Sequence, residues 1–100
     1  MKLNAAFIFL APNADYKKNR SVVQTEVVDL ITVGAKDYAD AVLAAKDLVA
    51  NGVNAIELCG GFGIEGVAQV KKAVGPEVAI GVVRFDNHPG LEFKSGDELF

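Results

Sequence analysis

The sequence predicts a single α/β domain, residues 1–100, with a four-stranded and mainly parallel sheet. Apolar segments of strand length alternate with segments of helical periodicity along the chain, and this alternation is typical of βαβ crossovers. Hydrophobic residues also make up 51% of the chain before its ten glycines are counted. An ordinary domain reaches about 45–50% with glycine included, so the excess predicts a sheet covered on both faces, a subunit interface, or both.

The first predicted strand is the continuous apolar segment 5–11, whose length suits a strand buried on both faces. A short helix is expected within residues 13–25, where Asp15 could cap its start, although the helical periodicity there is weak. The second predicted strand covers residues 27–33 and ends at Gly34.

The clearest helix follows, because Tyr38 and the apolar residues after it recur at the three- and four-residue spacing of one helical face. Asp37 can cap the start of this helix, and Gly52 can end it. The third predicted strand, 53–59, leads through a glycine turn into a helix over residues 64–74.

A fourth strand is predicted over residues 78–85, and an apolar segment, 86–100, follows it. Such a segment is expected to dock, either on its own domain or on a neighbouring subunit. Four strands and three helices, the first of them short, fit either a three-layer open sheet or part of a barrel that an oligomer completes. We therefore expect a homo-oligomer.

Charge and composition narrow the class of protein. The net charge of −3 provides no basic stripe, so no nucleic-acid partner is expected. The single cysteine excludes a disulfide within the chain and fits the reducing cytoplasm. No apolar run approaches the roughly 20 residues that span a bilayer, so no membrane contact is expected.

Two predicted strand ends carry most of the polar and reactive residues, and ligands of parallel α/β sheets bind at the carboxyl ends of the strands. The third strand ends in Cys59 and the glycine turn, and the fourth in Arg84 and the residues after it. This convergence predicts one ligand site, formed by Gly60, Gly61, Phe62, Gly63, Arg84, Asp86 and His88.

The glycine turn directly precedes a helix, whose free N–H groups and dipole favour a small anion or a phosphate. Residues 61–66 also match G-x-G-x-x-G, but the acidic residue expected about 20 residues later is unconvincing and the chain supplies half of a dinucleotide fold. In the alternative interpretation, these glycines serve only a tight turn and close packing. The residues identify no cofactor.

Cys59 and Glu57 are the candidate catalytic residues. A thiolate at Cys59 would be stabilised by the nearby helix start, although such a cysteine is often a small buried hydrophobe. Glu57 lies in a strand expected to be buried, so its carboxylate needs a partner, for which Arg84 is the natural candidate. Glu57 and Arg84 then form a structural ion pair. Alternatively, they act on a ligand, with Glu57 as an acid/base and Arg84 as an anion clamp. Asp86 and His88 are too few for a closed metal site, and no metal is predicted.

Several segments resemble a family of short, uncharacterised bacterial α/β proteins. They are Ala6-Phe7-Ile8-Phe9, Ile56-Glu57-Leu58-Cys59-Gly60-Gly61-Phe62-Gly63, Gly81-Val82-Val83-Arg84-Phe85-Asp86 with His88-Pro89-Gly90, and Ser95-Gly96-Asp97-Glu98-Leu99-Phe100. The resemblance spans nearly the whole chain. It implies the same element boundaries and the same site region, and it implies no reaction.

The leading hypothesis is a cytoplasmic protein that binds a small anionic metabolite at the Cys59–Gly63 turn, either as a binding protein or as a small enzyme. In an enzyme, the N–H groups of Gly61 to Gly63 would stabilise developing negative charge. Two alternatives are a non-catalytic assembly module and a thiol-dependent redox protein acting through Cys59.

Overall fold

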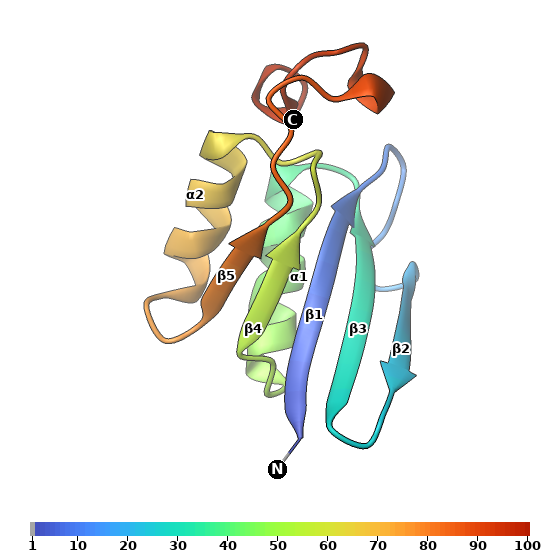
Figure 1. Ribbon diagram of the computed structural model, residues 1–100, viewed down its shortest axis with the longest axis vertical. Helices are drawn as coiled ribbons and strands as arrows, with labels where there is room; N and C mark the ends of the chain where they lie inside the picture. Colours follow the sequence, from blue (N-terminus) through green and yellow to red (C-terminus); the bar gives the residue numbers. More distant parts are fainter. Residues whose placement is uncertain (1) are drawn as a thin grey trace.

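The computed structural model describes residues 2–100, which form five β-strands, two α-helices and two short 3₁₀ turns (Figure 1). In chain order the elements are β1 (Leu3–Leu10), β2 (Arg20–Gln24), β3 (Val28–Ala35), α1 (Tyr38–Ala50), β4 (Ala55–Leu58), α2 (Ile64–Val74), β5 (Ala79–Val82), η1 (Pro89–Leu91) and η2 (Gly96–Glu98).

β1 occupies the centre of the sheet, whose strand order is β2-β3-β1-β4-β5. β3 and β4 both pair with β1 in parallel, and β5 pairs in parallel with β4. Of the five described strands, only β2 runs antiparallel to its neighbour, β3. The predicted class, an α/β fold with a mainly parallel sheet, is therefore confirmed.

The short helix predicted within residues 13–25 is wrong, because the second half of this segment forms the edge strand β2. Val22 and Val23 are β-branched, which favours an extended backbone, and both pair with residues of β3. The hairpin closes at Thr25, whose N–H and hydroxyl both donate to the Val28 carbonyl at 2.8 Å. The described chain thus has five strands and two α-helices instead of the predicted four and three.

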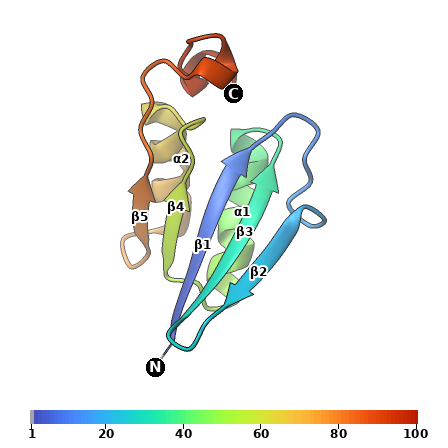
Figure 2. The same ribbon diagram turned by 45° about the vertical axis from the view of Figure 1, so that its right-hand side comes forward.

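Both α-helices lie on the same face of the sheet, as Figures 1 and 2 show. The chain passes from β3 through α1 to β4, and from β4 through α2 to β5, and it moves across the sheet in the same direction each time. Right-handed crossovers that advance in one direction place their helices on one side. The domain therefore has two layers, in place of the predicted three-layer or partial-barrel arrangement, and neither helix covers the second face.

The hydrophobic core fills the space between the sheet and the two helices, and Val70 of α2 is fully buried in it. Alternate strand residues point into it, among them Ile8, Val33 and Ile56, and all of these are almost completely buried. α1 presents mainly small side chains to the strands, which brings the helix close to the sheet; its buried residues are Tyr38, Ala41, Ala44, Ala45 and Leu48.

The ends of α1 follow the sequence prediction. The Asp37 carboxylate caps its start by accepting the N–H of Asp40 at 2.8 Å. After the helix, Gly52 adopts a φ of 97°, a left-handed backbone conformation that glycine reaches without strain. α2 covers residues 64–74 as predicted, with Glu65 in its first turn.

We predict that Gly66, in the first turn of α2, does not tolerate alanine. Alanine normally stabilises a helix by about 1 kcal/mol relative to glycine. At this position, however, a Cβ atom would overlap the ring of Tyr38. Gly66→Ala should therefore lower the free energy of unfolding, by up to about 2 kcal/mol. Urea denaturation followed by circular dichroism measures this change, and an increase in stability would contradict the contact.

Candidate functional site

The carboxyl ends of β1, β4 and β5 lie at one edge of the sheet, and the tail, residues 83–100, folds over this edge (Figures 1 and 2). Phe100 packs partly buried against the core, with its ring centroid 6.1 Å from that of Tyr38. The apolar tail thus docks on its own domain, which is one of the two outcomes expected from the sequence.

Asp97, in η2, caps the start of α2. Its Oδ2 accepts a hydrogen bond from the N–H of Glu65 and its Oδ1 accepts one from the N–H of Gly66, each at 3.2 Å. The Tyr38 hydroxyl also donates to Oδ1, at 2.8 Å. The helix N-terminus singled out in the sequence therefore holds an anionic group, and this group is the chain's own carboxylate.

Tyr38 joins α1, the glycine turn and the tail. Its hydroxyl accepts the N–H of Gly63 at 2.9 Å while it donates to Asp97, and its ring stacks on Phe62 with centroids 5.6 Å apart. Burial raises the pKa of Tyr38 to about 12, and the Asp97 carboxylate acts in the same direction because it would repel a phenolate. The Tyr38 hydroxyl is therefore a neutral donor at physiological pH.

The surroundings of Asp97 act on its pKa in opposite directions. Burial by itself raises this pKa, but the hydrogen bonds that the carboxylate accepts outweigh burial and hold the pKa below its ordinary value. The donors are the N–H of Glu65, the Tyr38 hydroxyl, and the N–H groups of Gly66 and Ile64. Asp97 is consequently ionised at neutral pH, when it stabilises the contact most.

The glycine turn between β4 and α2 is closely packed. A Cβ atom on Gly60 would overlap the ring of Phe85, and one on Gly63 would overlap the Asp97 carboxylate. The N–H of Gly61 donates to Sγ of Cys59 at 3.3 Å, so this group, like the N–H of Gly63, is engaged within the chain. These contacts favour the interpretation in which the glycines serve close packing.

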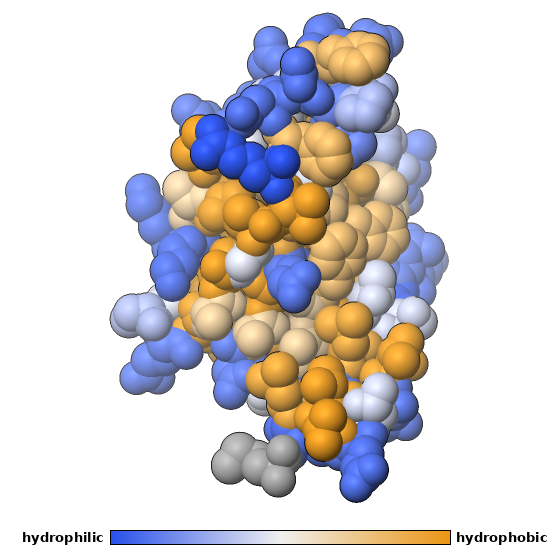
Figure 3. Space-filling view, viewed as in Figure 1, coloured by the Kyte–Doolittle hydropathy of each residue, from blue (hydrophilic) through white to orange (hydrophobic). Residues whose placement is uncertain are grey.

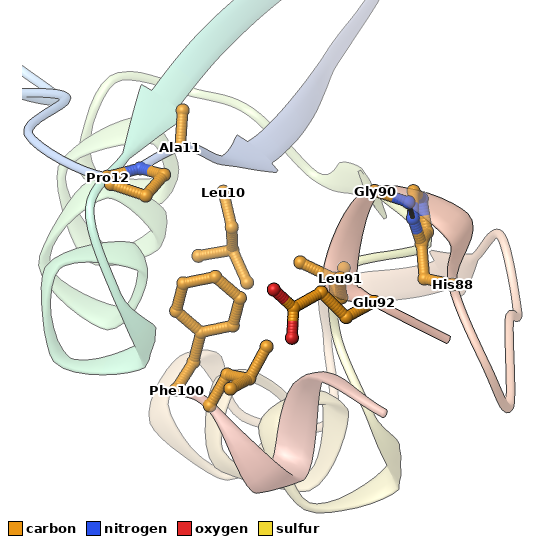
Figure 4. Close-up of a pocket in the computed structure, with 10 residues that line it drawn as sticks. Leu10, Ala11, Pro12, His88, Gly90, Leu91, Glu92 and Phe100 are labelled. Carbon is orange, nitrogen blue, oxygen red and sulfur yellow. Dashed lines mark hydrogen bonds between the residues drawn. The ribbon is translucent and has the colours of Figure 1, made fainter. Parts of the chain in front are cut away.

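A groove of about 640 Å³ lies between the carboxyl end of β1 and the tail, and we call it the tail groove (Figure 4). Its walls are mainly apolar, and among residues 2–100 only His88 and Glu92 contribute polar side chains to it. The principal wall residues are Leu10, Pro12, Leu91, Leu99 and Phe100, together with the backbone at Gly61 and Gly90. The groove is thus assembled from three segments that are far apart in the sequence.

His88 lies on one side of the tail groove with its orientation fixed. Its Nδ1 accepts the N–H of Gly90 at 2.9 Å, so in the neutral ring the proton resides on Nε2. The ring also packs against Phe85, with centroids 4.5 Å apart. In the described chain Nε2–H has no hydrogen-bond acceptor, and His88 can donate this bond to a ligand.

Glu92 is the second polar side chain of the tail groove; it is 88% exposed, and Figure 4 shows its carboxylate at the open side of the groove, near Leu91 and Phe100. Glu92 and Phe93 have φ values of 56° and 61°, left-handed conformations that cost non-glycine residues about 1–3 kcal/mol each. The Phe93 N–H bonds to the His88 carbonyl at 2.8 Å and helps to hold this backbone. Strain of this kind is often found at functional sites.

A second and smaller hollow, of about 150 Å³, lies on the other side of the glycine turn, and we call it the Arg84 hollow. The Arg84 guanidinium borders it and donates from Nε to Asp86 at 2.8 Å. The two side chains are 63% and 76% exposed, so this ion pair is highly solvated and contributes little to stability.

The predicted ligand-binding residues thus divide between two hollows at one edge of the sheet. Gly61 and His88 border the tail groove. Phe62, Gly63, Arg84 and Asp86 border the Arg84 hollow, whereas Gly60 lies under the Phe85 ring.

The two predicted catalytic residues lie apart from both hollows. Cys59 is half-buried, and its Sγ faces the N–H of Gly61. Glu57 is exposed on the sheet face that carries no helix, so the expectation that its carboxylate is buried is wrong. The expected ion pair with Arg84 is also wrong, because Arg84 pairs with Asp86. The error arises because the sheet is covered on one face only.

Residues 3–98 match the model of a family of unknown function, DUF6506. The chain belongs to this family. The sequence resemblance to a family without an assigned activity is thereby confirmed. Comparison of this DUF6506 chain with curated proteins found no match, and comparison with solved structures found none either.

Within residues 2–100 of the DUF6506 chain, no three His, Cys, Asp or Glu side chains are grouped in a way that could hold a metal ion. No helix in this part of the chain combines the length and the apolar character needed to cross a membrane.

Three residues of this edge, Tyr38, Asp97 and Glu92, were not among the site residues predicted from the sequence. Tyr38 appeared only as the first apolar residue of a helix. For Asp97 a signal does exist, since Ser95-Gly96-Asp97-Glu98 matches the spacing of a capping box, and the structure contains both of its hydrogen bonds. No local pattern indicates that Asp97 then reaches a helix 31 residues earlier.

We predict that Asp97→Ala lowers the free energy of unfolding at pH 7 by about 1–3 kcal/mol, because it leaves the α2 amides and the Tyr38 hydroxyl without their acceptor. The folded-state pKa of Asp97 lies below its ordinary 3.8. Its stabilising contribution is therefore complete above that ordinary value and is lost as the pH falls through the folded-state pKa. Urea denaturation across this pH range, with exposed Glu77→Ala as the control, should show the loss in the parent chain and not in Asp97→Ala.

The raised pKa of Tyr38 predicts that this tyrosine ionises at a higher pH than an ordinary tyrosine, as a separate late step in an alkaline titration. Tyr38 should ionise at about 12, and the stability that its neutral form provides should be lost as the pH rises from 10 toward that value. Absorbance at 295 nm measures the step. Tyr38→Phe should abolish it and Tyr16→Phe should leave it, and a late step that survives Tyr38→Phe would contradict the assignment.

Proposed function

We propose that the chain binds a small amphiphilic molecule in the tail groove, with the apolar part against the groove walls and a polar head between His88 and Glu92. One observation carries this proposal: an apolar groove of about 640 Å³ with two polar side chains lies at the carboxyl ends of parallel strands. Ligand pockets typically enclose about 300–1,000 Å³ and combine apolar walls with few polar groups.

The two polar side chains indicate which head group fits. His88 offers a donor at Nε2, and Glu92 offers two acceptor oxygens. A hydroxyl group can satisfy both, because it donates and accepts, and an amine satisfies the carboxylate with charge. The nearest cation, Lys94, has its Nζ 4.0 Å from the Glu92 carboxylate and only partly neutralises it. We therefore favour an alcohol or an amine over an anion in this groove.

An anionic metabolite is the second candidate, and its site would be the Arg84 hollow. This candidate retains Phe62, Gly63, Arg84 and Asp86 from the sequence prediction. The exposed Arg84 guanidinium favours this candidate. Its Nε donates a hydrogen bond to Asp86, and its two terminal NH₂ groups can donate to an anion. Asp97 also borders this hollow and opposes a second negative charge. A catalytic or redox role of Cys59 or Glu57 stays a prediction, as does location in the cytoplasm.

Three probes with the same six-carbon body distinguish these candidates: hexanol, hexylamine and hexanoate. Each is titrated into the ¹⁵N-labelled chain and followed by amide chemical shifts. Hexanol and hexylamine should shift Gly61, Gly90 and Phe100 with millimolar affinity, as expected for ligands of seven heavy atoms at about 0.5–0.6 kcal/mol per atom. Shifts at Phe62 and Arg84 with hexanoate would support the anion instead. No saturable shift with any probe at about 20 mM would contradict both proposals.

Two variants test the roles of the groove residues. Glu92→Gln should weaken hexylamine at least 3-fold and change hexanol less, because only the amine depends on the carboxylate charge. Leu91→Asn should weaken both probes by placing an uncharged polar group on an apolar wall. Glu77→Gln, on an exposed turn far from the groove, is the matched control for charge removal. Equal effects of Glu92→Gln and Glu77→Gln would place the head group elsewhere.

A further inference from the structure

The face of the sheet that carries no helix is largely apolar. Figure 3 shows orange and tan atoms spread across this face, interrupted by a small hydrophilic area. Large apolar side chains on this face are exposed to solvent: Val23 is 59% exposed and Leu3 is 44% exposed. Phe9 also lies on it, where its ring packs over Gly34. A monomer rarely leaves so continuous an apolar surface to water.

The strand register arranges this face in rows. One row contains Val23, Leu30, Ala5, Ala55 and Ala79, from β2 across to β5. The side chains are therefore large on the β2–β3 half and small on the β4–β5 half, with β1 between the two halves.

The next row contains Ser21, Thr32, Phe7, Glu57 and Gly81 in the same order of strands. In this row the two hydroxyl groups lie on the β2–β3 half, and the carboxylate lies on the β4–β5 half. Side chains in the same row project from the same face, so all of these groups are presented together.

We propose that two copies of the chain pack these faces against each other around a two-fold axis that runs along β1. Such an axis exchanges the two halves of the sheet and preserves each row. Val23 and Leu30 of one copy then lie opposite Ala79 and Ala55 of the other, so on the strands beside β1 large side chains meet small ones, while Phe7 of β1 faces Phe7. Two sheets pack about 10 Å apart, a spacing that pairs of this kind can fill.

The same axis also pairs the polar groups. It places the Glu57 carboxylate of one copy opposite the Thr32 hydroxyl of the other, with Ser21 beside it. A carboxylate that loses water at an interface needs donors, and hydroxyl groups supply them. An axis across the strands at this row would instead place Glu57 opposite Glu57, and on the β2–β3 half it would place large side chains opposite large ones. The pattern therefore selects a second copy as the occupant, and it selects one symmetry.

The face is large enough for a weak dimer. Strands of 8, 5, 8, 4 and 4 residues, at about 3.3 Å per residue and 4.8 Å between strands, cover roughly 460 Å² in projection. Two copies therefore bury roughly 900 Å² of surface in total, before the additional area of protruding side chains is counted. This value exceeds the ~800 Å² of ordinary crystal contacts and approaches the ~1,200 Å² of specific interfaces.

Sedimentation velocity of the full chain from about 10 to 200 μM tests the proposal, with a mass twice that of the chain expected at the upper end. Leu30→Arg should weaken the dimer at least 10-fold. The matched control is Leu43→Arg, which alters a leucine that is 53% exposed on α1, away from this face, and it should leave the dimer intact. A parent chain that is monomeric at 200 μM, or a dimer unaffected by Leu30→Arg, would overturn the proposal.

A pair of substitutions at one position tests the axis. Thr32→Lys should retain or tighten the dimer, because the ammonium group would face Glu57 of the other copy. Thr32→Glu should weaken it at least 10-fold through like charges. If the axis ran across the strands at the Thr32 row, Thr32 would face itself and both variants would weaken the dimer alike. Circular dichroism verifies that each variant is folded, and equal effects of the two substitutions would overturn the assigned symmetry.

Discussion

The contact of Asp97 with the first turn of α2 holds this domain's functional edge together. One carboxylate satisfies the N–H groups of Glu65 and Gly66 and accepts the Tyr38 hydroxyl, so it fixes the tail against both helices at once. The remainder of the edge depends on this contact. Phe100 and Leu99 form groove walls because η2 is anchored, and the glycine turn is held because Tyr38 also binds the N–H of Gly63. Without an anion at this position, the positive end of α2 would face the tail unsatisfied.

Glycine has the same physical role at several places around this contact. A Cβ atom on Gly66 would overlap the Tyr38 ring, and one on Gly96 would overlap the carbonyl of Gly61. The glycines of the turn and of η2 thus allow two backbones and a tyrosine to approach closely. In this chain the G-x-G-x-x-G spacing therefore reflects close packing around a carboxylate that the chain itself supplies. The resemblance to a phosphate-binding turn has a physical basis, since both arrangements neutralise the start of a helix.

Local patterns were sufficient to predict much of this fold and part of the site. The periodicity of α1, its Asp37 cap and the bounds of α2 follow from nearest neighbours in the sequence, and all three agree with the structure. The convergence of two strand ends follows from the geometry of parallel sheets. Residues 20–24 were mistaken for part of a helix because an edge strand pairs on one side only and shows little alternation. The exposure of Glu57 could not be predicted from its apolar neighbours, because it depends on both helices lying on one face. Asp97 was missed because its partners are far away in the chain.

The distance along the chain between Tyr38 and Asp97 also has a consequence for the order of folding. The β2–β3 hairpin closes through Thr25 and Val28, which are three residues apart, whereas the Tyr38–Asp97 hydrogen bond joins residues 59 apart. Loop closure over 59 residues costs about 3.6 kcal/mol of chain entropy from its length-dependent part alone. Pairing of β1 with β4, which joins Ala5 to Ala55, already meets most of this cost, so the Tyr38–Asp97 bond closes most easily once the sheet has brought the two partners together. A folding chain should pass through a stage in which the central strands are complete and the groove does not yet exist.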